Sequence, residues 1–395
     1  MSEDIYRKIN LIFVLGIIFF YAFYMRLTGL FIILLLASWL WGIFKGYIRF
    51  TQKDRLYLAL TLLPHVLAVF SLIYTADIKN GLFGLEKRFP LFALPLVLSS
   101  IPKFSSKQLN KIFSFTYWTF FWLCIVYLTI AVYRYIATGS SATLFWTELV
   151  SPIPLHPSYL SLCLSFIFYW KIIEWLNGNI TPGQKYISIT TLGILNLVII
   201  LLGSKIQLVM FYAIGLTIFL LNFRRVISNN RRLALFIGSS VIIVVVFLNS
   251  YTVERFKSIL NIEYEINAPA KTFNELTIRL GIIQCAADII QKNFLLGVGM
   301  GDVNNELYEI YTQYDFKFGY LNQLNPHNQY LSVLLGLGII GLLSFIASLL
   351  IPLSLSLKSK NYLYFIFLIL FVVGFLFESI LERQQGIIIF SLFNS

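Results

Sequence analysis

Charged residues are scarce in this chain, where Asp, Glu, Lys and Arg make up only 12% of 395 residues. A soluble domain carries about 25%. Cysteine is also rare: Cys124, Cys163 and Cys285 are an odd number without metal-ligand spacing, which indicates neither a disulfide framework nor a zinc site. These deficits exclude an ordinary soluble enzyme, a disordered protein and a nucleic-acid binder. Because 58% of the residues are hydrophobic, the composition instead predicts a polytopic membrane protein.

Long apolar runs predict an all-α fold of 11 or 12 transmembrane helices in a single integral membrane domain, residues 1–395. The first run follows Arg7 and Lys8 like a signal peptide, but it is long and lacks a small-residue cleavage site, so we expect a retained helix. A last segment, 387–393, is too short to cross alone and either completes a twelfth span or lies in the interface. The expected spans are 9–25, 27–44, 56–74, 89–101, 112–136, 159–176, 187–203, 206–223, 234–248, 330–355 and 363–381.

Lys and Arg in the short loops predict the orientation. If the N-terminus is inside, five short inside loops hold 14 of the 30 Lys and Arg and a single acid, Asp54. Short loops rich in Lys and Arg face the cytoplasm. The net charge of +12 is therefore explained largely by the loops that orient the protein in the membrane. The expected partners are membrane lipids and not nucleic acid. The inside loops are 45–55, 102–111, 177–186, 224–233 and 356–362.

The segment 249–329 is the large outer loop between the ninth and tenth spans, and it holds nine of the 18 acidic residues. It is the only place where a small extramembrane unit is expected, with helices over 273–292 and 303–314. The turn Gly297–Gly301 between them is expected to be flexible. It lacks the preceding strand and the Lys-Ser/Thr tail of a phosphate loop, so nucleotide binding is not expected. No His, Cys and carboxylate cluster has metal-ligand spacing, and we expect neither a metal nor a cofactor.

Ionisable residues at depth in a bilayer are costly and therefore suggest function. Those at the expected outer ends of spans come from distant parts of the chain, and their common depth suits a site at the outer leaflet. They are Lys87, Arg88, Arg134, His156, Lys205, Arg279, His327, Glu378, Glu382 and Arg383.

Lys205 interrupts an apolar stretch from 187 to 223 together with Gly203 and Ser204. The three residues form either a tight outer turn that carries one cation or part of a long helix with a buried lysine. A lysine that only snorkels to the interface is the alternative to a functional one.

His327 precedes a span, and a neutral imidazole suits general-base chemistry near neutral pH. An interfacial polar cluster is the alternative interpretation, and both apply also to His156. Arg88 and Arg279 are either interface anchors or forks for phosphate oxygens.

Glu378 and Glu382 are four residues apart, which predicts one helical face, with an ion-pair cluster including Arg383 as the structural alternative. His65, which follows Pro64 within a span, is expected to be a packed core histidine.

One segment resembles the signature of the O-antigen ligase and polymerase superfamily. It reads Asn-Pro-His-Asn-Gln-Tyr-Leu over 325–331 and continues as a Gly-rich apolar run to Gly341, after a large outer loop. The resemblance covers nearly the whole chain and is most specific over 203–386. Further similar segments are 85–90, 156–159, Arg279 with 293–302, and 378–386.

The resemblance implies an architecture like that of the C-type glycosyltransferases, in the bacterial inner membrane, with the active site facing the periplasm. The implied donor is a glycan on undecaprenyl diphosphate, and the implied acceptor is lipid A–core or a growing glycan, without a metal or cofactor. The family's histidine falls on His327 and one arginine on Arg279. Its second arginine falls on Lys205, which keeps the charge but loses the bidentate fork.

The expected catalytic residues are therefore His327, Arg279 and Lys205, and the loop 249–329 is expected to contribute to the active site. The residues expected to bind substrate are Arg88, His156, Asn328, Tyr330, Glu378, Glu382 and Arg383.

An O-antigen ligase is the first functional prediction. A polymerase and a glycan transferase that acts on protein remain open. A lipid-linked glycan transporter would require ionisable residues at the midplane of several spans and two symmetric halves, which the sequence does not show.

Overall fold

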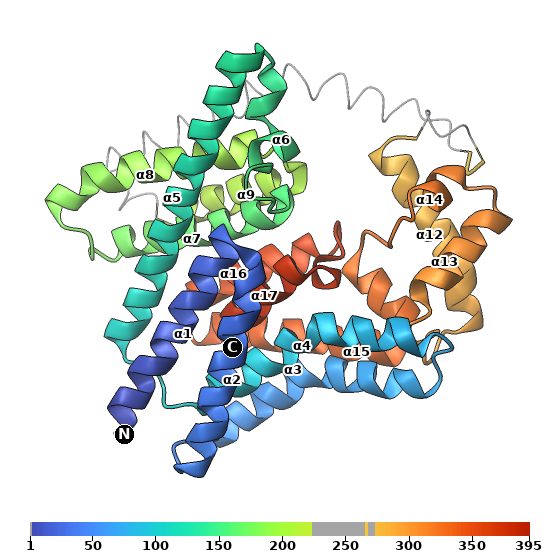
Figure 1. The fold of residues 1–395 in the computed structure, drawn as a ribbon, viewed down its shortest axis with the longest axis horizontal. Coiled ribbons are helices and arrows are strands. Elements are labelled where there is room, and N and C mark those ends of the chain that lie inside the picture. Colours follow the sequence, from blue (N-terminus) through green and yellow to red (C-terminus); the bar gives the residue numbers. More distant parts are fainter. Residues whose placement is uncertain (1, 223–264, 268–272) are drawn as a thin grey trace. The chain divides into compact units, whose positions relative to one another are not determined.

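The computed structural model describes residues 2–222, 265–267 and 273–395 (Figure 1). Every regular element in these ranges is a helix, so the all-α prediction is confirmed. Seven described helices are long and apolar enough to cross a membrane, as expected of a polytopic protein. Three more apolar helices are shorter, Lys205–Leu221, Tyr362–Gly374 and Gln384–Phe393. The expected span 234–248 and inside loop 224–233 lie outside the described residues.

The chain divides into two compact units, each of which is made of three separate stretches of the sequence. The first unit takes residues 1–50, 97–249 and 361–370, and the second takes 51–96, 250–360 and 371–395.

The first unit is built around α7 (Pro157–Leu176), which is buried along most of its length. A helix that is apolar on all sides needs neighbours on all sides, and α5 (Ser106–Thr138), α8 (Pro182–Leu201) and α9 (Lys205–Leu221) pack against α7. Two more helices, α1 (Glu3–Phe23) and α2 (Thr28–Phe44), are joined by the short η1 (Met25–Leu27), and α1 packs on α5.

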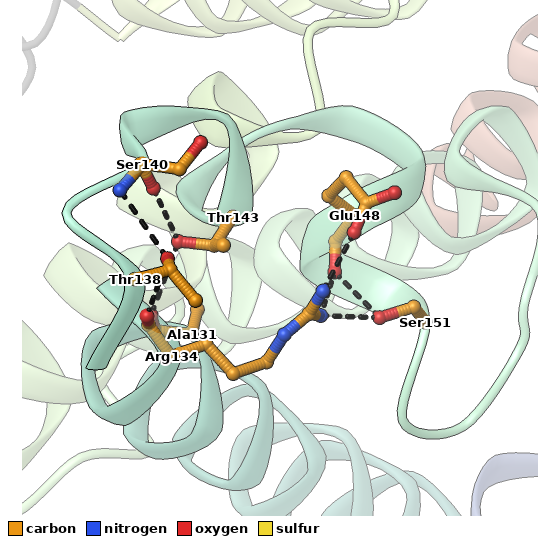
Figure 2. A network of polar contacts seen from close by, with 7 residues as sticks. All are labelled: Ala131, Arg134, Thr138, Ser140, Thr143, Glu148 and Ser151. Atoms are coloured by element: carbon orange, nitrogen blue, oxygen red, sulfur yellow. Dashed lines mark hydrogen bonds and ion pairs between the residues drawn. The ribbon is translucent and has the colours of Figure 1, made fainter. Parts of the chain in front are cut away.

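Helix α5 has 33 residues, which at about 1.5 Å per residue makes it about 50 Å long. The hydrocarbon core is about 30 Å thick, so the ends of α5 extend beyond it. At its C-terminal end the Arg134 guanidinium donates to the Glu148 carbonyl (3.1 Å) and carboxylate (2.7 Å) and to the Ser151 hydroxyl (2.5 Å), as Figure 2 shows. These bonds fix the connection through η3 (Ser141–Leu144) and α6 (Trp146–Val150) that leads to His156.

The second unit contains α3 (Gln52–Phe70), extended by η2 (Ser71–Ile73), and α15 (Gln329–Lys358), which packs along α3. Helix α4 (Ile78–Ser100) begins in this unit. Helices α12 (Glu275–Lys292), α13 (Val303–Gln313) and α14 (Lys317–Leu321) lie together (Figure 1). Their bounds agree with the expected helices 273–292 and 303–314 to within two residues. They share an apolar core that includes Ile282, Cys285, Leu307, Tyr311, Phe316 and Leu335 of α15.

The expected helix 363–381 is wrong in its extent, because α16 (Tyr362–Gly374) ends seven residues earlier. Residues 375–383, here the tip segment, contain only the short η5 (Ile380–Glu382) before α17 (Gln384–Phe393). At about 1.5 Å per residue, α16 and α17 are about 20 and 15 Å long, so neither spans the hydrocarbon core alone. The end of α16 packs against α17 through Phe371 and Phe390, whose ring centroids lie 5.1 Å apart.

Helix α15 is interrupted at Gly338, whose φ of +62° lies in the left-handed region. The chain 294–299 fills this interruption. The amides of Val298 and Gly299 donate to the carbonyls of Leu335 (2.9 Å) and Gly336 (3.0 Å). The Ile339 amide donates back to the Phe294 carbonyl at 2.8 Å. The two segments approach each other so closely that neither Gly297 nor Gly338 has room for a Cβ.

Alanine at Gly338 is expected to destabilise the second unit. The left-handed backbone alone costs about 1–3 kcal/mol for a residue with a side chain. In addition, a Cβ there would press on the backbone of Leu295 and on the Leu296 amide nitrogen, 2.5 Å away. Thermal unfolding of the purified protein measures the effect. Gly183→Ala is the matched control, because a Cβ at Gly183 meets nothing within 4 Å, and an equal loss in both variants would contradict the explanation.

Candidate active site

The segment 325–332 attaches the tip segment to the start of α15. The Gln329 amide donates to the Phe375 carbonyl (2.8 Å), and the Gln329 side-chain oxygen accepts from the Leu381 amide (2.7 Å). The Tyr330 hydroxyl donates to the Val372 carbonyl at 2.8 Å. The Asn328 side chain caps α15 by accepting from the Leu331 amide at 3.0 Å. Asn328 and Tyr330, expected to bind substrate, therefore each make a structural contact.

His327 has a left-handed backbone conformation, with φ of +46°. Asn325 stabilises this conformation, because its side-chain oxygen accepts from the His327 amide at 3.0 Å. The His327 Nδ1 lies 3.7 Å from Glu378 Oε2 of the tip segment. The imidazole is 30% exposed and the Glu378 side chain 16% exposed. A partly exposed imidazole is thus held against a more deeply buried carboxylate. A non-glycine residue with positive φ is typical of functional sites, where geometry matters more than local stability.

Arg279, on the second turn of α12, lies against the same two segments. Its guanidinium donates to the His327 carbonyl oxygen at 3.3 Å. It also lies 5.6 Å from the centroid of the Phe377 ring, next to Glu378 in the tip segment. This arrangement brings a cation, an imidazole and a carboxylate from three separate stretches of chain into contact.

Arg88 of α4 pairs with Glu382, whose carboxylate also accepts from the Ser332 hydroxyl at 2.9 Å. The two charged side chains are only 10% and 22% exposed. Burial by itself raises the pKa of Glu382, but the charge and hydrogen bond of Arg88 and the hydrogen bond of Ser332 outweigh it, and the pKa lies below its ordinary value. The pair therefore fixes the tip segment to α4 and α15.

Replacing Arg88 with methionine is expected to destabilise the protein by about 3–5 kcal/mol, because Glu382 is left buried without its cation. The double variant Arg88→Met/Glu382→Gln should regain most of this loss. Since the pKa of Glu382 is lowered on folding, the contribution of the pair is complete above the unfolded value of about 4.3 and is lost as the pH falls below it. Thermal unfolding of the three proteins between pH 3.5 and pH 7 measures both effects, and equal destabilisation by single and double variants would contradict them.

Two other predicted residues lie in the first unit. His156 is the residue that precedes α7, and Lys205 is the first residue of α9. Helix α8 ends at Leu201 and Gly203 has φ of +60°, so 203–205 form a tight turn and not a continuous helix. The hydroxyls of Ser158 and Ser204 lie 3.1 Å apart, which brings the two loops together, and the Lys205 side chain is exposed.

Residues 189–346 match the family model of the O-antigen ligases. This match supports the resemblance to the O-antigen ligase and polymerase superfamily. The matched segment includes Lys205, Arg279 and His327, whereas Arg88 and the tip segment lie outside it. No curated protein matches the chain. The match supports a membrane enzyme of the ligase or polymerase type that resembles glycosyltransferases, with lipid-linked glycans as the general class of substrate.

Glu378 and Glu382 do not share a helical face, because both follow the end of α16. Each instead has its own partner, His327 or Arg88, and Arg383 is exposed at the start of α17. Phe377, which contacts Arg279, was not among the predicted site residues. An aromatic residue inside an apolar run carries no signal that separates it from packing residues. Within the described ranges, no group of three or more His, Cys, Asp and Glu is arranged to hold a metal ion.

Proposed function

We propose that this protein transfers a glycan from undecaprenyl diphosphate to a sugar hydroxyl of lipid A–core, at the periplasmic face of the bacterial inner membrane. The observation that carries the proposal is the contact of His327 with Glu378 and of Arg279 with the His327 carbonyl. These contacts combine a base (His327), a residue that orients it (Glu378) and a cation (Arg279). His327 and Arg279 lie in the segment that matches the family model, and Glu378 lies outside it.

His327 acts as the general base. A proton on Nδ1 directed at Glu378 leaves the lone pair on Nε2 free to accept the proton of the acceptor hydroxyl. The hydroxyl oxygen forms its bond to the anomeric carbon of the donor while the bond from that carbon to the diphosphate oxygen breaks. A direct displacement of this kind inverts the configuration at the anomeric carbon. The Glu378 carboxylate stabilises the imidazolium that results.

Arg279 stabilises the leaving group. As its bond to the sugar breaks, undecaprenyl diphosphate gains negative charge, and a guanidinium fork matches phosphate oxygens in geometry and charge. Contacts with the His327 carbonyl and with Phe377 hold the guanidinium in place before the donor binds. Lys205, on the segment where the family carries its second arginine, is proposed as a further cation for the donor diphosphate, and His156 as a residue that binds substrate.

The experiment uses the purified protein in liposomes with a glycan on undecaprenyl diphosphate as donor. Lipid A–core, a second copy of the donor and a peptide are offered separately as acceptors. The proposal predicts transfer to lipid A–core with release of undecaprenyl diphosphate. Elongation of the second donor copy would instead identify a polymerase, and labelling of the peptide a protein glycan transferase. Movement of the intact donor between leaflets without any new glycosidic bond would identify a transporter and refute the enzyme.

A further inference from the structure

The segment Gly297–Asp302, here called the clasp, is held on the side away from α15 by the connection between α3 and α4. The Asp302 carboxylate accepts from the amides of Ala76 and Asp77, each at 2.7 Å. These are the last amides before α4, so a negative charge there also complements the positive end of the helix dipole. Asp302 is 8% exposed, and its two oxygens each have one donor.

Three further hydrogen bonds hold the clasp and the residue before it. The Gly301 amide donates to the Thr75 hydroxyl and the Met300 amide to the Ser71 hydroxyl, both at 3.2 Å. The Tyr74 hydroxyl donates to the Leu296 carbonyl at 2.6 Å. Gly299 has φ of +92°, and a Cβ there would lie 3.0 Å from the Thr75 Cβ. The expected flexible turn is therefore anchored on both of its sides, against α15 and against the α3–α4 connection.

The clasp joins the elements that carry the proposed site. Helix α12, with Arg279, ends at Lys292, five residues before the clasp begins, and α15 begins two residues after His327. The connection that Asp302 binds leads into α4, which carries Arg88. A shift of the clasp along α15 would therefore move α12, and with it the Arg279 guanidinium, relative to the His327 carbonyl that it contacts.

We propose that Asp302 is a positioning residue, which fixes the place of Arg279 beside His327 by locking the clasp to the start of α4. The inference rests on the proposed function for its kinetic consequence but not for its structural one. Carboxylate bonds to backbone amides are stronger than neutral ones. Asparagine, the isosteric replacement, keeps one acceptor oxygen but presents an NH₂ group to the other backbone N–H, so one bond becomes a repulsive contact.

The structural test measures the distance between spin labels on α13 and α4 by pulsed electron–electron double resonance. Glu309→Cys and Leu82→Cys carry the labels, since both side chains are exposed while the three native cysteines are buried. The labelled protein with Asp302 is expected to give one narrow distance distribution, and the same protein with Asp302→Asn a broadened or shifted one. Identical narrow distributions would overturn the proposal, whatever the protein catalyses.

The kinetic test is a double-mutant cycle between Asp302 and Arg279. A misplacement of about 1 Å costs about 10²-fold in rate, so Asp302→Asn should lower kcat, per folded enzyme, by about 10–100-fold. If Asp302 acts through Arg279, the same substitution should lower kcat no more than about twofold when Arg279 is already alanine. A role in stability alone would lower the folded fraction in both backgrounds and leave kcat of the folded enzyme unchanged, which would overturn the proposal.

Asp315→Asn is the matched control, because Asp315 is an exposed carboxylate between α13 and α14. Among the described ion pairs it pairs only with Lys317, at 3.4 Å. Asp315→Asn should change neither the distance distribution nor kcat. If Arg279→Ala itself transfers glycan at the wild-type rate, the proposed function fails. The distance measurement then still decides whether Asp302 locks the clasp.

Discussion

Replacing His327 with asparagine is expected to lower glycan transfer by about 10²–10⁴-fold, the usual contribution of a general base. Asparagine cannot take the proton of the acceptor hydroxyl, so the attack on the anomeric carbon loses its assistance. Release of undecaprenyl diphosphate by the reconstituted protein measures the loss. The membrane-inserted yield and thermal unfolding should stay close to those of the wild type.

The choice of substitution matters because His327 has φ of +46°. Asparagine tolerates the left-handed region, whereas alanine does not. His327→Ala therefore combines loss of the base with backbone strain, and it should be as inactive as His327→Asn but less stable. An asparagine variant that transfers glycan at the wild-type rate, beside an inactive alanine variant, would show that backbone conformation and not the imidazole is required.

Replacing Arg279 with alanine is expected to lower kcat by about 10²–10³-fold, the range for loss of one group that stabilises developing charge. The reason is that the diphosphate leaving group gains charge as its bond to the sugar breaks. Arg279→Lys should recover part of the rate, because lysine keeps the charge but cannot form the bidentate fork. Transfer rates of both variants in liposomes, at saturating donor and acceptor, provide the measurement.

Lys317→Ala is the control for Arg279, because Lys317 is an exposed cation of the same helical cluster. It should transfer glycan like the wild type. A loss in Arg279→Ala confined to KM for the donor, with kcat unchanged, would mean that Arg279 contributes equally to the ground state and the transition state. That result would contradict its role on the leaving group.

The apolar pattern predicted most helices because their periodicity and length are local properties. The turn at Gly203 could be recognised as one of two alternatives, since a glycine and a lysine interrupt the run there. The tip segment could not, because Leu376, Phe377, Ile380 and Leu381 continue the apolar pattern through a segment that forms no α-helix. The tip segment is held by contacts with residues about 50 positions earlier, including Gln329 and Ser332.

The same limit applies to the candidate site. His327 and Arg279 could be named from the resemblance, but their contact depends on the fold of α12 against the start of α15. The glycines at 297–301 suggested a flexible turn by composition. Their close approach to Thr75 and Leu335 depends on elements that are distant in the sequence. Which glutamate pairs with His327 and which with Arg88 likewise follows from the path of the tip segment.

Chemical rescue of a His327→Gly variant tests whether the His327 imidazole accepts the proton of the acceptor hydroxyl. Glycine at position 327 tolerates the positive φ and leaves space where the imidazole ring was. Transfer by His327→Gly in liposomes is measured with increasing free imidazole. If His327 is the base, we expect almost no transfer without imidazole and a rate that rises with the imidazole concentration. Transfer at the wild-type rate in the absence of imidazole would contradict this role.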